Sequence, residues 1–123
     1  MGRVIHVGLW KIKKNAPSRS VQEVYRRVAA FKSQIPGILE SHAGGFTYFE
    51  LPKKIVETYG VNPDVSVLAR GYNAALYVVF ESEKARRFYD EAQPHLDLAD
   101  YLLPLLENGM EEVINFDLVI PSA

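Results

Sequence analysis

Apolar and polar residues alternate along residues 3–13, which is the pattern of a β-strand with two different faces. One face holds Val4, His6, Gly8, Trp10 and Ile12, and the other holds Ile5, Val7, Leu9 and Lys11. We therefore predict a first strand that turns His6 and Trp10 to the same side.

The next pattern has the spacing of a helix. After a turn at residues 15–18, apolar residues recur every three or four positions up to Pro36-Gly37. Ser20 with Glu23 fits a capping box at the start, and Ser18 is an alternative cap. The pattern predicts an amphipathic helix with one buried stripe, which ends at the Pro-Gly pair.

Two further strands are predicted, one on each side of a stretch with a weaker pattern. The pattern favours a strand at 38–43 and a strongly apolar strand at 72–80, which we expect to be buried on both faces. Between them the pattern weakens, although 53–59 can form a short helix. We interpret about 45–68 as an excursion from the domain, because it is too short to bury a core of its own.

The remainder reads as a broken helix and a last strand. Ser82 caps a helix through Tyr89, and the helix breaks near Gln93-Pro94. A second apolar helix is predicted at 96–106, and the final strand at 112–120.

The order strand, helix, strand, strand, broken helix, strand is the βαββαβ arrangement of ferredoxin-like α+β folds, here as one domain over 1–123. Helices on one face of such a sheet leave the other face uncovered. We expect that face to be rich in Trp10, Tyr77, Val79 and Phe116. A second copy in twofold symmetry is the simplest cover for it, so the pattern predicts a homodimer.

Composition narrows the function classes. The 123 residues are 48% hydrophobic and 24% charged with a net charge of -1, which gives no electrostatic reason to bind nucleic acid or an anionic membrane. The absence of cysteine excludes a disulfide framework and thiolate chemistry. Apolar runs are too short to span a bilayer and the N-terminus lacks a secretory pattern, so we expect a cytoplasmic protein.

Five segments in order resemble the stress-responsive dimeric α+β barrel family. They are Ile5-His6-Val7, Gln34-Ile35-Pro36-Gly37, Gly71-Tyr72-Asn73-Ala74-Ala75-Leu76, Val79-Phe80-Glu81-Ser82 and Phe116-Asp117. The resemblance covers nearly the whole chain apart from about 45–68, where this sequence is longer. It implies two ferredoxin-like subunits that close a barrel, with a pocket between each sheet and its own helices.

The catalytic members that this chain is similar to are polyketide cyclases of the olivetolic acid cyclase type, enzymes of secondary metabolism. The resemblance implies an aldol condensation without metal or cofactor, in which Tyr89 and His95 match the catalytic tyrosine and histidine. It also matches His6 to a histidine of the pocket. The family writes His-Pro-x-His where this chain has Ala92-Gln93-Pro94-His95, so a different substrate remains open.

The chemistry of these side chains fits that role. His95 has the pKa range to take a proton from carbon between two carbonyls, and Tyr89 can donate a hydrogen bond to the oxygen where charge develops. Six residues along an unbroken helix would separate the two side chains by about 120°. Pro94 forces a turn just before His95, so that both can face one cavity.

The remaining predicted pocket residues surround this pair. His6 can orient the substrate or a water molecule, and His42 reads as structural or exposed. The predicted substrate-binding residues are His6, Gly8, Trp10, Tyr25, Leu76, Leu98 and Leu102. The histidines lack the short spacing of metal ligands, and no phosphate loop or dinucleotide fingerprint is present, so we expect neither metal nor cofactor.

Three functions stay open at this point. The first is a cofactor-free lyase or cyclase acting on a polyketide-like or other β-carbonyl small molecule. The second is a non-catalytic small-molecule binding or stress-response protein, and the third is a cofactor-independent monooxygenase. The excursion can cover the pocket, extend the dimer contact or decorate the surface.

Overall fold

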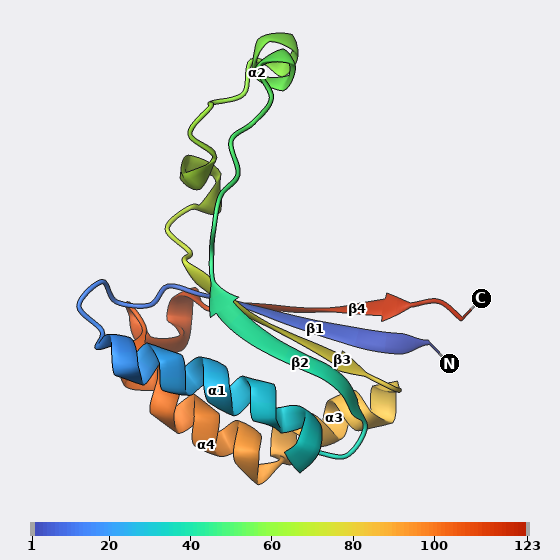
Figure 1. The fold of residues 1–123 in the computed structure, drawn as a ribbon. Coiled ribbons are helices and arrows are strands. Elements are labelled where there is room, and N and C mark those ends of the chain that lie inside the picture. The colour runs from blue at the N-terminus through green and yellow to red at the C-terminus, as the bar shows by residue number, and fades with distance from the viewer. Residues whose placement is uncertain (1, 123) are drawn as a thin grey trace.

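The computed structural model describes residues 2–122 and contains a four-stranded antiparallel sheet in the order β2-β3-β1-β4. The strands are β1 (Arg3–Trp10), β2 (Ile38–Gly45), β3 (Ala74–Phe80) and β4 (Ile114–Ile120). Three helices cover one face of the sheet: α1 (Ser18–Gln34), α3 (Glu83–Glu91) and α4 (Gln93–Leu102) (Figure 1). The predicted ferredoxin-like βαββαβ order is confirmed.

Strand alternation decides which side chains enter the core. His6 and Trp10 of β1 point to the helices and are 6% and 2% exposed. Trp10 therefore belongs to the core, and its predicted place on the uncovered face is wrong; it shares the parity of His6 along the strand. β3 is buried on both faces only at its end, because Val79 on the outer face is buried whereas Tyr77 on the same face is 39% exposed.

The predicted capping box of α1 is also absent. The helix begins at Ser18, directly after Pro17, and no side chain caps it. Pro17 disfavours helical geometry at Ala16, so the helix begins after the proline without a cap. Glu23 instead accepts hydrogen bonds from Arg26 and Arg27 on the helix surface.

The break between the last two helices lies earlier than predicted. Ala92 has an extended conformation, with φ -68° and ψ 134°, and Pro94 falls in the first turn of α4. A proline there costs no hydrogen bond, since the first amides of a helix have no partner within it. α4 ends at Leu102 rather than Leu106, and a short 3-10 turn at Leu103–Leu105 contains Pro104.

The predicted excursion is an arm, residues 46–73, which stands on the side of the sheet opposite the helices (Figure 1). It contains α2 (Lys53–Tyr59), which confirms the predicted short helix, and a 3-10 helix at Val65–Ala69. No residue of the arm is buried. Within residues 2–122, no helix is long and apolar enough to cross a bilayer.

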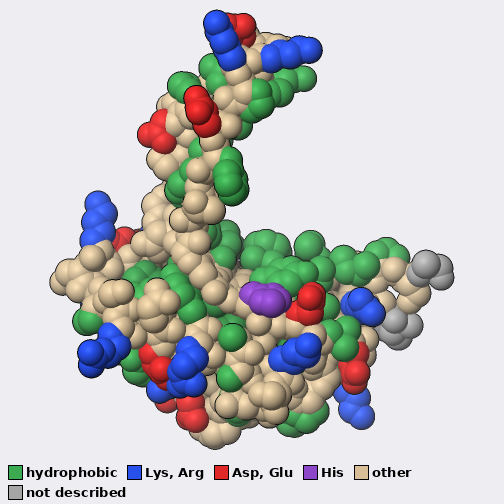
Figure 2. All heavy atoms as spheres, viewed as in Figure 1, with side chains coloured by type: hydrophobic (Ala, Val, Ile, Leu, Met, Phe, Trp, Pro, Cys, Tyr) green, Lys and Arg blue, Asp and Glu red, His purple; other side chains and the backbone are tan. Residues whose placement is uncertain are grey.

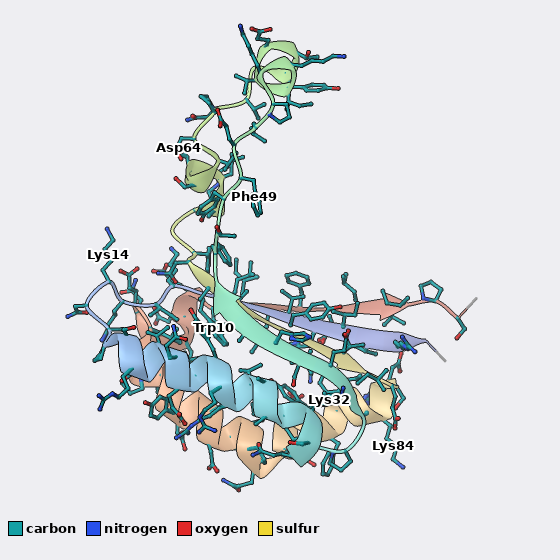
Figure 3. The ribbon with its side chains drawn as sticks, in the orientation of Figure 1. Trp10, Lys14, Lys32, Phe49, Asp64 and Lys84 are labelled. Atoms are coloured by element: carbon teal, nitrogen blue, oxygen red, sulfur yellow. The ribbon has the colours of Figure 1, made fainter. Side chains whose placement is uncertain are left out.

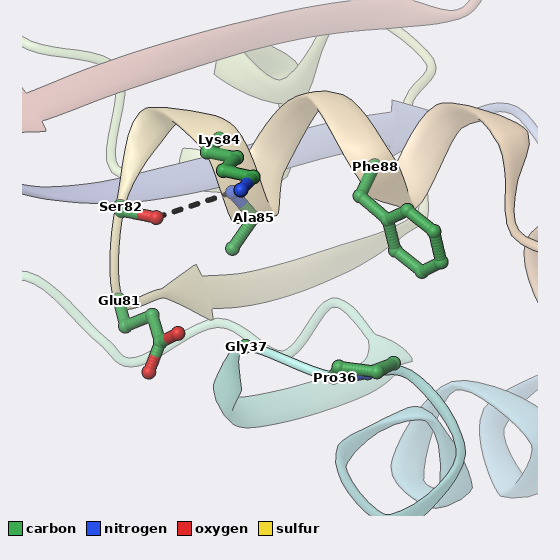
Figure 4. Close-up of a pocket in the computed structure, with 7 residues that line it drawn as sticks. All are labelled: Pro36, Gly37, Glu81, Ser82, Lys84, Ala85 and Phe88. Carbon is green, nitrogen blue, oxygen red and sulfur yellow. Dashed lines mark hydrogen bonds between the residues drawn. The ribbon is translucent and has the colours of Figure 1, made fainter.

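The turn from α1 into β2 depends on a glycine. Gly37 has φ +85°, and a Cβ atom built on it would lie 2.5 Å from the Cβ atom of Ala85 in α3. The Ser82 hydroxyl accepts a hydrogen bond from the Ala85 amide at 3.2 Å, as predicted for the cap of α3 (Figure 4). Gly37 therefore allows α3 to pack closely against the start of β2.

We predict that Gly37→Ala lowers the free energy of unfolding by about 2–4 kcal/mol, because it adds steric overlap to a left-handed backbone. Gly60→Ala is the matched control: its φ is +63°, but nothing lies within 4 Å of its Cβ position. It should cost about 1 kcal/mol or less. Urea unfolding of the three proteins measures both values, and equal losses would show that the contact with Ala85 is unimportant.

Candidate functional site

A small cavity of about 60 Å³ lies between the inner face of the sheet and the helices. Its walls are mostly apolar, and the polar side chains are two histidines, a tyrosine and an asparagine. The lining residues are His6, Trp10, Leu76, Tyr89, His95, Leu98, Ala99, Leu102, Met110, Val113 and Asn115. An apolar cavity with a few convergent polar groups is the usual form of a small-molecule site.

Most of the predicted site residues meet at this cavity, but two do not line it. A Cβ atom on Gly8 would lie 3.0 Å from Oδ1 of Asn115. The missing side chain of Gly8 therefore makes room for Asn115, which lines the cavity. Tyr25 is half-buried, and its hydroxyl lies 3.5 Å from the Cβ position of Gly45 at the end of β2. His42 lies on the opposite face of the sheet, where it stacks on Tyr77 with ring centroids 6.1 Å apart.

Tyr89 and His95 contact each other directly. Their ring centroids are 4.2 Å apart, because Ala92 turns the chain between them. Phe31 and Phe80 pack edge-on against the Tyr89 ring, at centroid distances of 5.7 and 5.2 Å, and hold it in place. Tyr89 is fully buried.

Within the described part of the chain, two buried polar side-chain atoms have no hydrogen-bond partner: the Tyr89 hydroxyl oxygen and Nδ1 of His95. Such a group costs about 1–3 kcal/mol relative to a paired one, so it is uncommon in a folded protein. Both atoms belong to residues that line the same cavity. A bound molecule with a polar oxygen can pair with both.

Burial sets the protonation of the pair. It lowers the pKa of His95 below the ordinary value of 6.5, although the backbone and the carboxylate of Asp90 act in the opposite direction. Burial also raises the pKa of Tyr89 well above its ordinary value of 10.0. At neutral pH, His95 is therefore an unprotonated base and Tyr89 a neutral hydrogen-bond donor.

His6 is held by a chain of charged groups. Its Nδ1 atom lies 2.9 Å from Oδ1 of Asp117, and Arg86 donates from Nε to the same oxygen at 2.6 Å. Arg86 also pairs with Asp90 at 2.8 Å. A carboxylate only accepts hydrogen bonds, so Nδ1 of His6 carries the hydrogen and Nε2 is the basic nitrogen of the neutral ring.

The pKa values of this chain of groups follow from burial and pairing. Burial, together with the charge of Arg86, lowers the pKa of His6 despite the bond to Asp117. Burial alone would raise the pKa of Asp117, but its hydrogen bonds with Arg86 and His6 lower it. Asp117 therefore stays ionised and orients a neutral His6.

Sequence reasoning missed part of this arrangement. Asn115 and Asp117 alternate on the last strand on one side, and β1 pairs with β4 so that His6 lies opposite Asp117. That alternation is a usable signal, but only the pairing of the two strands gives it meaning. Nothing in the local pattern marks Ala99, Met110 or Val113 as lining residues.

Larger hollows lie on the surface, and one of about 320 Å³ is lined by Arg86, Asp90 and Asp117 but not by Tyr89 or His95. Another of about 300 Å³ lies at the start of α3 and is lined by Pro36, Gly37, Glu81, Ser82, Lys84, Ala85 and Phe88 (Figure 4). It contains none of the predicted site residues. Within residues 2–122, no group of three histidine, aspartate or glutamate side chains is placed to hold a metal ion.

We predict that the free energy of unfolding falls as the pH is lowered from 7.5 to 5.5. The pKa values of His6 and His95 are lowered in the folded protein, so below about pH 6.5 the unfolded chain binds protons that the folded chain excludes. Each histidine contributes at most about 1.4 kcal/mol per pH unit. His95→Asn should reduce this slope in urea unfolding, and an unchanged slope would contradict the burial of His95.

No family model and no curated protein matches this sequence. Solved structures do match it. A dimeric ferredoxin-like protein of unknown function from Jannaschia is 16% identical and superposes with a TM-score of 0.72, over 97% of this chain and 100% of that chain. A hydroxynitrile lyase from Passiflora edulis is 16% identical, with a TM-score of 0.71 over 99% and 96% of the two chains.

A variant of SnoaB, a cofactor-independent oxygenase from Streptomyces nogalater, is also similar: 16% identical, with a TM-score of 0.61 over 100% of this chain and 97% of that chain. The similarity extends along the full length of all these proteins, so the arm does not obscure the common architecture. At such low identity the similarity establishes the fold, and this chain is a ferredoxin-like α+β protein of the kind found in dimeric barrels.

Proposed function

We propose that the protein is a cofactor-free lyase or cyclase for a small carbonyl compound, with His95 as base and Tyr89 as hydrogen-bond donor. The observation that supports this most directly is the pair of unpartnered buried atoms, Oη of Tyr89 and Nδ1 of His95, beside one cavity. A substrate carbonyl oxygen that accepts from Oη of Tyr89, with its acidic proton against Nδ1 of His95, gives both atoms a partner.

The proposed reaction is a proton transfer followed by a change at a carbon–carbon bond. Neutral His95 takes a proton from carbon next to a carbonyl, and Tyr89 donates a hydrogen bond to the oxygen that becomes an enolate. In the condensing direction the enolate carbon bonds to a second carbonyl, whose oxygen takes the proton back from His95. In the cleaving direction the same steps run in reverse, so the enzyme ends each cycle unchanged.

The size of the cavity favours a small substrate. About 60 Å³ is well below the 300–1,000 Å³ that is typical of sites for drug-sized ligands. A polyketide-length chain would need the cavity to widen. Met110 is 50% exposed and lines it, and a flexible thioether side chain is the wall that moves most easily. Of the predicted substrates, a short β-carbonyl compound therefore fits best.

His6 and Asp117 supply orientation in this proposal. The Asp117 carboxylate holds Nδ1 of His6, and Arg86 in turn holds the carboxylate. The basic Nε2 atom of His6 is then available to the substrate or to a water molecule. The apolar walls formed by Trp10 and Leu98 exclude bulk water and strengthen these interactions.

The structural neighbours support catalysis in this fold. One of them is a hydroxynitrile lyase and another is a cofactor-independent oxygenase. Both names are those of enzymes, and the first enzyme is a lyase, the class of activity proposed here. The neighbours described as dimeric also support the proposal that this chain forms a homodimer.

The test is an absorbance assay on short β-keto esters and thioesters and an aromatic cyanohydrin. We expect His95→Asn to lower kcat/KM on an accepted substrate by about 10²–10⁴-fold, because it removes the base. Tyr89→Phe should lower it by about 10²–10³-fold, because the donor is lost. His42→Asn and Tyr101→Phe are the matched controls, since neither side chain lines the cavity, and both should keep the wild-type rate.

The outcomes separate the alternatives. Equal activity in the wild type and in both site variants contradicts the proposed mechanism. Binding of a substrate analogue without turnover, lost in Tyr89→Phe, indicates a small-molecule binding protein, for which the unpartnered buried atoms also argue. Turnover that stops when dioxygen is removed indicates a monooxygenase.

A further inference from the structure

The arm exposes an unusual amount of apolar surface. Phe49 is 81% exposed and Tyr59 is 74% exposed, and no residue of 46–73 is buried. Its other exposed large apolar side chains are Tyr48, Ile55, Val67 and Leu68. Contiguous apolar surface on this scale is typical of a contact with another macromolecule.

The base of the arm is fixed to the sheet. The Asn73 side chain makes two hydrogen bonds of 2.8 Å with the backbone of Ile12, and the backbone N–H of Asn73 donates to the Trp10 carbonyl at 3.0 Å. The Phe46 amide donates to the Asn73 carbonyl at 2.8 Å, and the Tyr72 hydroxyl donates to the Glu112 carbonyl at 2.5 Å. The arm is therefore held at one end of the sheet.

The arm and the outer face of the sheet form one L-shaped apolar surface. Figure 2 shows hydrophobic side chains along the sheet and up the arm above it. Phe49 projects from the flank of the arm that overlooks the sheet, and Asp64 from the opposite flank (Figure 3). The half-buried or exposed apolar residues of the outer face are Ile5, Val7, Leu9, Tyr77, Ile114, Phe116, Leu118 and Ile120.

The total surface area also indicates a missing contact. The chain exposes 8106 Å², whereas a compact monomer of 13.9 kDa exposes about 6,700 Å². The excess, roughly 1,400 Å², exceeds the roughly 800 Å² that each partner buries in a standard interface. The arm has three acidic residues, Glu50, Glu57 and Asp64, and three basic ones, Lys53, Lys54 and Arg70, so it offers no net charge to a nucleic acid or an anionic partner.

We propose that the arm clasps a second copy of this chain. With the twofold axis across the strands, two sheets that meet by their outer faces place their arms at opposite ends of the pair. The Phe49 flank of each arm then packs against the far end of the partner, and the apolar surface of both copies is covered. This inference rests on the proposed homodimer, but not on the proposed catalysis.

The first test is sedimentation equilibrium of the full chain. We expect the wild type to have twice the 13.9 kDa of one chain, and Phe49→Ser combined with Tyr59→Ser to weaken dimerisation at least tenfold. These substitutions leave the fold intact, because neither side chain is buried. Phe88→Ser is the matched control: Phe88 is 49% exposed on α3, on the helical side, and its loss should leave dimerisation unchanged.

A second test uses the absence of cysteine from the natural sequence. A single thiol at Phe49→Cys should react with a maleimide at least tenfold more slowly than one at Phe88→Cys, since only the first is covered in the dimer. Equal rates in a dimeric protein, or unchanged dimerisation of the arm variants, overturn the clasp and leave the homodimer standing. A wild type that stays monomeric overturns both the clasp and the dimer, whereas binding of neutral phosphatidylcholine vesicles through Phe49 overturns the clasp.

Discussion

Antiparallel pairing on both sides of β1 is the constraint on which the rest of this structure depends. The pairing with β4 places His6 opposite Asp117, although the two are 111 residues apart in sequence. The pairing with β3 extends the sheet face against which the helices pack. Side chains alternate strictly along a strand, so a register shift of one residue would move His6 to the outer face. His6 would then lose its hydrogen bond with Asp117 of β4, which also binds Arg86 of α3.

The candidate site shows how a small core tolerates groups that oppose folding. The buried His6 and Tyr89 and the half-buried His95 lie between the sheet and the last two helices, and the ionised Asp117 lies at the edge of this space. The buried His6 has a hydrogen-bond partner in Asp117, which Arg86 binds in turn. Oη of Tyr89 and Nδ1 of His95 line one cavity and have no hydrogen-bond partner. Aromatic packing by Phe31 and Phe80 and the pinned register of the strands hold this less stable arrangement in place.

The outer face presents the opposite problem. A sheet with helices on one side leaves the other side uncovered, and here most side chains of that side on β1 and β4 are apolar. The arm adds to the exposed apolar area and is itself too short to form a core. Because its base is fixed at one end of the sheet, the arm and the outer face of the sheet can contact the same partner.

The sequence by itself determined the order of the elements, the amphipathic first helix, the short helix of the arm and the meeting of Tyr89 with His95. Each of these follows from local periodicity, from proline or from caps, which act within a few residues. Tertiary structure decided which face of β1 receives Trp10, that Ala92 rather than Gln93 is the point of the break, and that Asp117 holds His6. Those outcomes depend on strand pairing and close packing between distant segments, and no local pattern contains that information.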